Sequence, residues 1–232
     1  MFFLNKNAQQ LAFVGHFFVV SKIICIFVVY FFANFNFANG LKKSNFMQEE
    51  IKKAIEILRK GGVILYPTDT IWGIGCDATN SQAVERIFQI KKRDDSKALI
   101  ILIDSDKRLQ IYVEQVPDVA WDLIDCADKP LTIIYPKGKN LAQNLLAEDS
   151  SIAIRITKEE ISRSLCYALQ KPLVSTSANI SGETAPQNFS EISDEICSQV
   201  DYILPFRQDE KTTTTPSNII KLGVNGEFKI IR

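Results

Sequence analysis

From residue 47 onward, the chain alternates short, uniformly apolar segments with amphipathic segments of helical period. The apolar run Ala98–Ile103, for example, follows a predicted helix that Asn80 can cap. Buried strands of α/β proteins show this continuous hydrophobicity, because both of their faces are covered. The alternation therefore predicts one α/β domain over residues 47–232, with a twisted, mixed parallel and antiparallel sheet flanked by helices.

The other predicted elements follow the same rules. A helix is expected over residues 48–60, because its apolar residues recur at i, i+3, i+4 and i+7, and Gly61-Gly62 ends it. Pro117 lies in the first turn of a later helix, Thr157 and Glu160 form a capping box for a helix that reaches about residue 170, and Ser190 can cap another. Strands are predicted over residues 63–66, 98–103, 131–135, 152–156, 172–174, 202–204, 218–222 and 228–231.

Residues 1–46 form an apolar N-terminal extension that differs in composition from the rest. Residues 11–38 are apolar enough to span a bilayer, although Lys22 interrupts the run. Three interpretations compete: a membrane anchor, an atypical signal peptide, or translated sequence upstream of the true start. Because Met47 is followed at once by a well-formed amphipathic helix, we favour the third interpretation.

Charge and cysteine content restrict the class of protein. Residues 1–46 contain four lysines and no acid, which leaves 23 cations against 27 acids, or −4, for residues 47–232. A general polyanion-binding surface is therefore not expected, and any anion site must be local. The five cysteines show no C-x-x-C spacing, so we expect them to be reduced and mostly buried in a cytosolic protein.

His16 is the only histidine of the chain, and it lies in the N-terminal extension. Ser-His-Asp and Cys-His mechanisms and most catalytic zinc sites are thereby excluded for residues 47–232. Gly73-x-Gly75-x-x-Ala78 matches a dinucleotide fingerprint on paper, but we reject it because Pro67 and five further residues separate it from the preceding strand. No P-loop motif is present.

Polar residues gather where predicted strands or helices end. The segment Lys91–Lys97 carries four cations between a helix and a strand, where α/β proteins often bind ligands. By itself it is more typical of a solvated helix end. The Thr68–Thr70 and Ser175–Asn179 loops add hydroxyls, an amide and a carboxylate, and Arg155 lies within an apolar strand. Together these groups favour binding of a phosphorylated ligand and charge stabilisation during phosphoryl or nucleotidyl transfer.

These segments, in this order, resemble the YrdC family, the threonylcarbamoyl-AMP synthases of the short single-domain type. The resemblance covers essentially all of residues 47–232, and its most specific part is the Lys-x-Arg plus Ser-x-Asn combination. One departure is Asp128-Lys129, where family members often have Pro-Gly. The matching segments are Gly62–Thr70, Trp72–Ala78, Lys91-x-Arg93 with Lys97, Lys129–Thr132, Ile154-Arg155 and Ser175–Gly182.

The resemblance implies that L-threonine, bicarbonate or CO2, and ATP give L-threonylcarbamoyl-AMP and pyrophosphate. The product serves t6A modification of adenosine 37 in tRNAs that read ANN codons, through a downstream transferase complex. Mg2+ would accompany ATP, held by phosphate oxygens rather than by a protein cage. A cytoplasmic location is implied, or a membrane-tethered one if residues 11–38 are an anchor.

The resemblance also implies residue roles. The catalytic residues would be Lys91, Arg93 and Lys97. Nucleotide contacts would come from Lys91, Lys97, Ser177, Asn179, Ser217 and Asn218. The threonine and carbamate pocket would be formed by Thr68, Thr70, Arg93, Thr132, Arg155 and Ser177.

An alternative from a different class is a module that binds double-stranded RNA or tRNA, or acts in ribosome maturation. The charge of residues 47–232 weighs against it, unless their cations form one concave patch.

Overall fold

The computed structural model describes residues 44–93, 99–211, 216–225 and 227–232. The chain divides into two compact units, residues 1–49 and residues 50–232. Of the first unit only residues 44–49 are described, and they are helical. The apolar segment 11–38 lies outside the described residues. Within the described part of the chain, no helix has the length and apolar character needed to cross a membrane.

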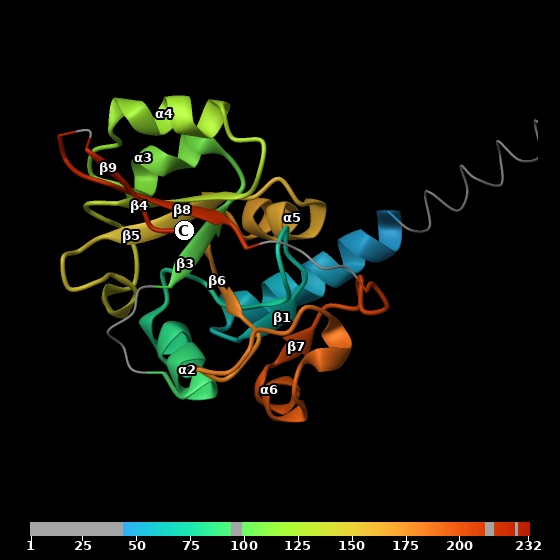
Figure 1. Cartoon of the computed structure of the whole chain (residues 1–232). Helices are drawn as coiled ribbons and strands as arrows, with labels where there is room; N and C mark the ends of the chain where they lie inside the picture. The colour runs from blue at the N-terminus through green and yellow to red at the C-terminus, as the bar shows by residue number, and fades with distance from the viewer. Residues whose placement is uncertain (1–43, 94–98, 212–215, 226) are drawn as a thin grey trace, which may run out of the picture. The chain divides into compact units, whose positions relative to one another are not determined.

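The second unit is built on one sheet of nine described strands (Figure 1). Its spatial order is β7-β1-β2-β6-β3-β5-β4-β8-β9. The pairs β1/β7, β3/β5 and β4/β8 are parallel and the other five are antiparallel. The predicted mixed sheet is therefore confirmed. The strands are β1 Ile64–Tyr66, β2 Gly73–Gly75, β3 Ile100–Ile103, β4 Leu131–Tyr135, β5 Ile152–Ile156, β6 Leu173–Ser177, β7 Tyr202–Ile203, β8 Asn218–Leu222 and β9 Phe228–Ile230.

Helices pack on this sheet, and their sequence patterns explain where they begin. Asn80 caps α2 with its side-chain oxygen, which accepts hydrogen bonds from the backbone N–H groups of residues 82 and 83, as predicted. The first predicted helix is confirmed: it ends at residue 59, and Gly61 then adopts a φ of 81°, which favours glycine. The other helices are α3 Leu109–Tyr112, α4 Asp118–Asp125, α5 Glu160–Leu169 and α6 Asp194–Gln199; α2 spans Ser81–Lys91.

Two predicted caps are wrong by three residues or fewer. The cap of α5 is Glu159, whose carboxylate accepts from the Ser162 backbone N–H at 2.8 Å, whereas the Thr157 hydroxyl bonds to the Ser162 hydroxyl. The cap of α6 is Ser193, and Ser190 lies in the preceding 3-10 turn. Both segments offer several capping residues in succession, so local sequence alone does not select between them.

The segment after Pro67, predicted to be a loop, contains the short strand β2. Its glycines are required by packing: a Cβ on Gly75 would lie 2.4 Å from the Val174 carbonyl oxygen of β6. The rejection of a dinucleotide fingerprint is confirmed, because Gly73 and Gly75 belong to a strand between β1 and β6. A phosphate-binding turn needs them at a strand-to-helix junction instead.

The two faces of the sheet have different covers. Alternation along β4 and β5 places Ile133 and Ile154 on the face that α3 and α4 cover, where Leu109 and Ile124 pack (Figure 1). Thr132 and Arg155 pair on the opposite face. Polar groups from several loops gather on that second face.

The described cysteines are free, as expected, but fewer are buried than predicted. Cys76 and Cys166 are buried, Cys126 is exposed and Cys197 is half-buried. Cys126 immediately follows α4, at the surface end of that helix, so it escapes burial.

Candidate active site

A cavity of about 350 Å³ opens on the sheet face that carries Arg155. It lies where β2, β6 and β3 run side by side, because Gly73 of β2 pairs with Ser177 of β6, and Ser175 of β6 pairs with Ile100 of β3. The loop between β1 and β2 forms one wall and the segment before β8 forms another. Six residues predicted from the sequence line this cavity: Thr68, Thr70, Arg93, Arg155, Ser177 and Ser217.

The Lys91-x-Arg93 motif lies at the end of α2, where the chain turns sharply. Lys92 adopts the left-handed conformation with φ 47° and ψ 46°. Its N–H donates to the Gln89 carbonyl, and that of Arg93 donates to the Phe88 carbonyl, a Schellman-type ending. Three adjacent cations consequently diverge: Lys91 is buried, Lys92 forms an exposed ion pair with Glu195, and Arg93 lines the cavity.

Lys91 is enclosed by the Ser177-x-Asn179 loop. Its ammonium donates hydrogen bonds to the Ser177 carbonyl at 2.6 Å and to the Asn179 carbonyl at 2.7 Å, and lies 3.5 Å from Asn179 Oδ1. Its own carbonyl accepts from the Ser181 N–H at 2.8 Å. Lys91 is 2% exposed, so its charge is used to fasten the loop to α2.

The side chain of Asn179 is also committed to the loop. Its amide nitrogen donates to the carbonyls of Ile180 and Glu183, at 3.0 and 2.8 Å. The two residues of each motif therefore have different positions. Lys91 and Asn179 are hydrogen-bonded to each other, whereas Arg93 and Ser177 line the cavity. Asn179, Lys91, Thr132 and Asn218 do not line the cavity, and Lys97 lies outside the described residues.

The Lys91 ammonium lies close enough to Arg93, which lines the cavity, for the two charges to interact, so loss of the Lys91 charge should weaken anion binding there. Burial, and secondarily the neighbouring Arg93 guanidinium, lower the pKa of Lys91 to about 8. Its charged form is therefore lost as pH rises through about 8, earlier than for an ordinary lysine. For ATP, the ligand that the sequence resemblance implies, we therefore expect affinity to fall as pH rises from about 7 to about 9.5. Lys91→Met, which also removes the hydrogen bonds to the loop, should lower it about tenfold or more at pH 7.

Calorimetric ATP binding measures both effects without the pH-dependent supply of bicarbonate. Lys91→Arg is the control, because its guanidinium stays charged over this pH range and should flatten the profile. Equal affinities of the wild type at both ends of the range would contradict the expectation.

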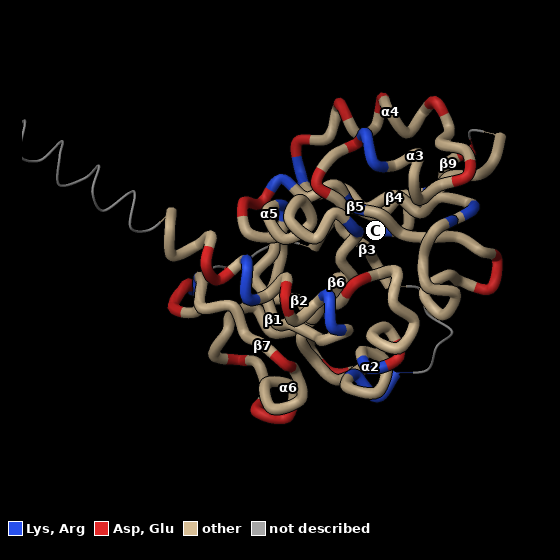
Figure 2. Tube along the Cα trace, turned by 180° about the vertical axis from the view of Figure 1, so that it is seen from behind, with Lys and Arg blue, Asp and Glu red and all other residues tan. Residues whose placement is uncertain are grey.

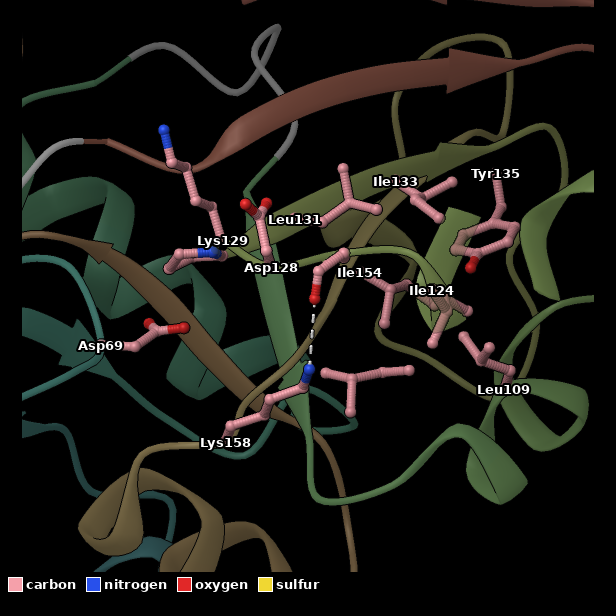
Figure 3. Close-up of a pocket in the computed structure, with 13 residues that line it drawn as sticks. Asp69, Leu109, Ile124, Asp128, Lys129, Leu131, Ile133, Tyr135, Ile154 and Lys158 are labelled. Atoms are coloured by element: carbon pink, nitrogen blue, oxygen red, sulfur yellow. Dashed lines mark hydrogen bonds between the residues drawn. The ribbon is translucent and has the colours of Figure 1, made fainter. Parts of the chain in front are cut away.

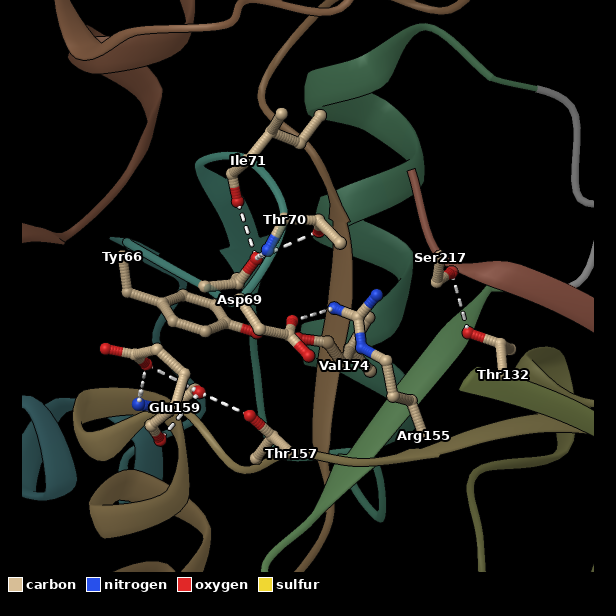
Figure 4. Close-up of polar contacts among 12 residues, drawn as sticks. Tyr66, Asp69, Thr70, Ile71, Thr132, Arg155, Thr157, Glu159, Val174 and Ser217 are labelled. Atoms are coloured by element: carbon tan, nitrogen blue, oxygen red, sulfur yellow. Dashed lines mark hydrogen bonds and ion pairs between the residues drawn. The ribbon is translucent and has the colours of Figure 1, made fainter. Parts of the chain in front are cut away.

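The Thr68–Thr70 loop is braced by its own hydroxyls (Figure 4). Thr68 Oγ1 donates to the Ile71 carbonyl at 2.7 Å and accepts from the Thr70 N–H at 3.0 Å. Arg207, from the segment after β7, donates to the Thr68 carbonyl at 3.1 Å and lies 3.5 Å from the Glu159 carboxylate. The loop is thus held by hydrogen bonds among its own residues and by Arg207 from a distant segment.

Asp69 of this loop forms a buried ion pair with Arg155 (Figure 4). Arg155 Nη2 lies 3.0 Å from Asp69 Oδ1, and the two side chains are 5% and 13% exposed. Arg155 Nε is buried without a hydrogen-bond acceptor among the described residues. The pair neutralises one carboxylate, and the guanidinium still borders the cavity, where an anionic ligand would supply the missing acceptor.

Thr132 and Ser217 bind one another beneath the cavity edge. Their hydroxyls lie 3.0 Å apart, and both residues are almost fully buried (Figure 4). Arg232 Nε donates to the Ser217 carbonyl at 3.1 Å and also lines the cavity. Thr132 therefore positions Ser217 and does not itself border the cavity.

The cavity is cationic and rich in hydroxyls. Arg93, Arg155 and Arg232 line it, and the described lining residues include no aspartate or glutamate. Arg232 and Gln187 had no sequence signal, because neither belongs to a matching segment. Trp72 was in a recognised motif, but its packing against Phe189, with ring centroids 4.8 Å apart, was not predictable. The arrangement suits a ligand with several anionic groups.

A second cavity of about 230 Å³ lies on the other face of the sheet (Figure 3). Leu109, Ile124, Ile133 and Ile154 line it, with Asp69 at one end. Its walls are mostly apolar, and its two cations, Lys129 and Lys158, are accompanied by Asp69 and Asp128, so it suits a triphosphate less well than the first cavity. The cationic cavity is therefore the candidate for binding an anionic ligand, and Asp69, which lines the second cavity, pairs with Arg155 of the first.

Comparison with known proteins agrees with this geometry. The model of the Sua5/YciO/YrdC family, described as telomere recombination, matches residues 56–232. A threonylcarbamoyl-AMP synthase of Pseudoalteromonas translucida (strain TAC 125) is 37% identical over 185 residues, which are 78% of this chain and 96% of that protein.

Two solved structures share the fold. E. coli YciO has 31% identity and a TM-score of 0.69, over 80% of this chain and 89% of that one. P. abyssi Sua5 complexed with L-threonine has 28% identity and a TM-score of 0.69, over 74% of this chain. The present chain spans about half the length of that Sua5, 50% of which is covered.

Proposed function

Because the chain belongs to the Sua5/YciO/YrdC family, we propose that it is a threonylcarbamoyl-AMP synthase. It would join L-threonine, bicarbonate or CO2, and ATP into L-threonylcarbamoyl-AMP with release of pyrophosphate. The observation that supports this most directly is the single cavity that combines Arg93, Arg155 and Ser177 with further hydroxyls.

The proposed reaction needs no protein nucleophile. A carbamate oxygen of N-carboxythreonine attacks the α-phosphorus of ATP, forming a P–O bond as the bond between that phosphorus and the bridging oxygen of pyrophosphate breaks. Negative charge grows on the departing pyrophosphate, and fixed cations near it stabilise the transition state. Arg93 is the described cation best placed for this role, and we assign a second one to Lys97 of the same segment.

The remaining roles divide between contact and support. We assign phosphate or nucleoside contacts to Ser177 and Ser217, which line the cavity. Asn218 begins β8 beside Ser217, and we keep it as a candidate nucleotide contact. Lys91 and Asn179 act by holding the loop that presents Ser177.

Threonine would occupy the part of the cavity bordered by Thr70 and Arg155, where Arg155 Nε lacks an acceptor. Its carboxylate would supply that acceptor. The L-threonine complex of the related P. abyssi Sua5 supports a threonine site in this fold. Thr68 and Thr132 shape the pocket through their hydrogen bonds to neighbouring residues.

Magnesium would enter as the ATP complex and offset phosphate charge. The described lining of the cavity carries hydroxyls and guanidinium groups, which suit the phosphate oxygens. We therefore propose that those oxygens and water hold the ion. The product would pass to a transferase complex for t6A formation in tRNA.

Dependence on both small substrates tests the proposal. Purified protein with ATP should release pyrophosphate only when threonine and bicarbonate are both present, and the product should have the mass of threonylcarbamoyl-AMP. Serine in place of threonine controls for nonspecific activation of ATP turnover. Pyrophosphate release that is indifferent to threonine would refute the assignment.

A module that binds double-stranded RNA or tRNA is the second candidate. Lysine and arginine alternate with acidic residues along the trace of the described chain (Figure 2), and α4 contributes Asp118, Asp122 and Asp125. Such interspersed charge does not favour a polyanion surface. RNA binding that weakens steeply with salt would support this candidate instead.

A further inference from the structure

Strand β9, Phe228–Ile230, forms one edge of the sheet (Figure 1). It pairs with β8 on one side, and no described strand pairs with it on the other. The N–H of Gly223 donates to the Glu227 carbonyl at 2.7 Å, and that of Ile231 donates to the Ile219 carbonyl at 2.8 Å. In an antiparallel pair these directions alternate, so the backbone groups of Phe228 and Ile230 point outward.

The side chains of this edge are unusually apolar for an exposed strand. Phe228 is 63% exposed and Ile230 is 68% exposed, and Val224 in the preceding turn is 63% exposed. Phe228 pairs with the buried Leu222, so Phe228 and Ile230 project on the face that α3 and α4 cover farther along the sheet. Edges of this kind readily accept another strand, and no proline interrupts this one.

The charges of the strand also lack partners within the described residues. No ion pair joins Glu227 or Lys229 to another described group. Lys229 lies directly opposite Lys221 of β8, whose ammonium already binds Asp149 at 2.7 Å. A nearby acid would therefore relieve repulsion at Lys229.

We propose that a second copy of this chain occupies the edge, with two β9 strands paired antiparallel about a two-fold axis at Phe228. This register sets Glu227 opposite the partner's Lys229 and Lys229 opposite the partner's Glu227. Phe228 meets the partner's Phe228 as a hydrogen-bonded pair, because both present their backbone groups outward. Ile230 then lies diagonal to the same aromatic pair, within reach of it.

Charge favours this register over the registers with the two-fold axis at Lys229 or Ile230. An axis at Lys229 would bring two lysines face to face, which is unfavourable. An axis at Ile230 would place Phe228 opposite the partner's Arg232 and Lys229 opposite the partner's Ile231, so neither the charges nor the aromatic rings would pair. Only the axis at Phe228 pairs both charges and both aromatic rings at once.

The interface is small, so the dimer should be weak and depend on concentration. It involves one strand and its turn per subunit, toward the lower end of specific interfaces. The proposal goes beyond the proposed activity and does not require it. It does adjoin the catalytic cavity, because Arg232 follows β9 and lines that cavity.

Charge exchange in the full chain tests the register. In analytical ultracentrifugation from about 1 to about 300 µM, wild-type protein should shift from monomer toward dimer. Glu227→Lys and Lys229→Glu should each weaken dimerisation about tenfold or more, because each brings like charges together twice. The double variant Glu227→Lys/Lys229→Glu should restore it, which a merely structural role of either residue would not produce.

Covalent capture provides a second measurement. In a Cys126→Ser background, which removes the one cysteine that is exposed among the described residues, Phe228→Cys should form an intersubunit disulfide under mild oxidation. Hydrogen-bonded antiparallel pairs hold Cα atoms about 5.5 Å apart, which suits a disulfide. Ile231→Cys is the matched control, since it is also exposed but lies away from the axis.

Four outcomes overturn the proposal. Monomeric wild-type protein at every concentration would mean that another segment or partner covers β9. A dimer that ignores both single charge reversals would use a different surface. Failure of the double variant to recover, or equal cross-linking of the Ile231→Cys control, would refute the register.

Discussion

Replacing Arg93 by alanine should lower threonine-dependent pyrophosphate release by about 10²- to 10³-fold, the usual effect of removing one fixed group that stabilises transition-state charge. Arg93 lines the cationic cavity, and burial lowers the pKa of its guanidinium without removing its charge at neutral pH. The loss should appear mainly in kcat, because charge on the departing pyrophosphate develops as the bond breaks.

The adjacent cation provides the control. Lys92→Ala removes a charge one residue away, but Lys92 points to solvent and pairs with Glu195. Its activity should stay within about twofold of wild type, as exposed ion pairs contribute little. Equal losses for Arg93→Ala and Lys92→Ala would show that general positive charge, and not the placement of Arg93, supports the reaction.

The second large effect is expected at the Arg155–Asp69 pair. Arg155→Met should destabilise the fold by about 3–5 kcal/mol, because it leaves the Asp69 carboxylate buried without its cation. Asp69→Asn should also destabilise it, by leaving the guanidinium unpaired. Urea unfolding measures both, and the double variant should recover part of the lost stability.

Measurements of activity distinguish the contribution of this pair to stability from its proposed role in threonine binding. Arg155→Met, alone or with Asp69→Asn, should raise the KM for threonine, because the cavity loses the guanidinium proposed to bind the carboxylate. Arg86→Met is the control for stability: its ion pair with Asp201 is exposed, so its loss should cost about 1 kcal/mol or less. A double variant with normal threonine KM would exclude Arg155 from the threonine site.

Much of the fold was accessible from local sequence patterns. The amphipathic helix that ends before Gly61 and the Asn80 cap were predictable, because helical period and capping act over four residues or fewer. The strand β2 was not, because Gly73–Gly75 has little strand propensity and is held by β1 and β6 on its two sides. The positions of the α5 and α6 caps were not predictable either, because several neighbouring polar residues could each cap the helix.

The candidate site was likewise only partly predictable from the sequence. Its motifs identified Arg93, Ser177, Thr70 and Arg155, all of which line the cavity. The motif did not show that the Lys91 side chain holds the Ser177–Asn179 loop. Its ammonium binds the carbonyls of residues 177 and 179, which lie 86 and 88 residues away in sequence, so only tertiary packing brings them together. Arg232 joins the cavity only through the pairing of β9 with β8.

By itself, the sequence determined the alternation of buried strands with amphipathic helices, the absence of a catalytic histidine from residues 47–232, and the set of cations and hydroxyls at the chain turns. Tertiary structure decided which of those groups face one cavity. The physical reason is that a cation near a strand end can be stabilised in three ways. It can donate hydrogen bonds to backbone carbonyls, form an ion pair with a carboxylate, or bind an anionic ligand. Only the packing of distant segments determines which partner is available, and thereby separates Lys91 from Arg93.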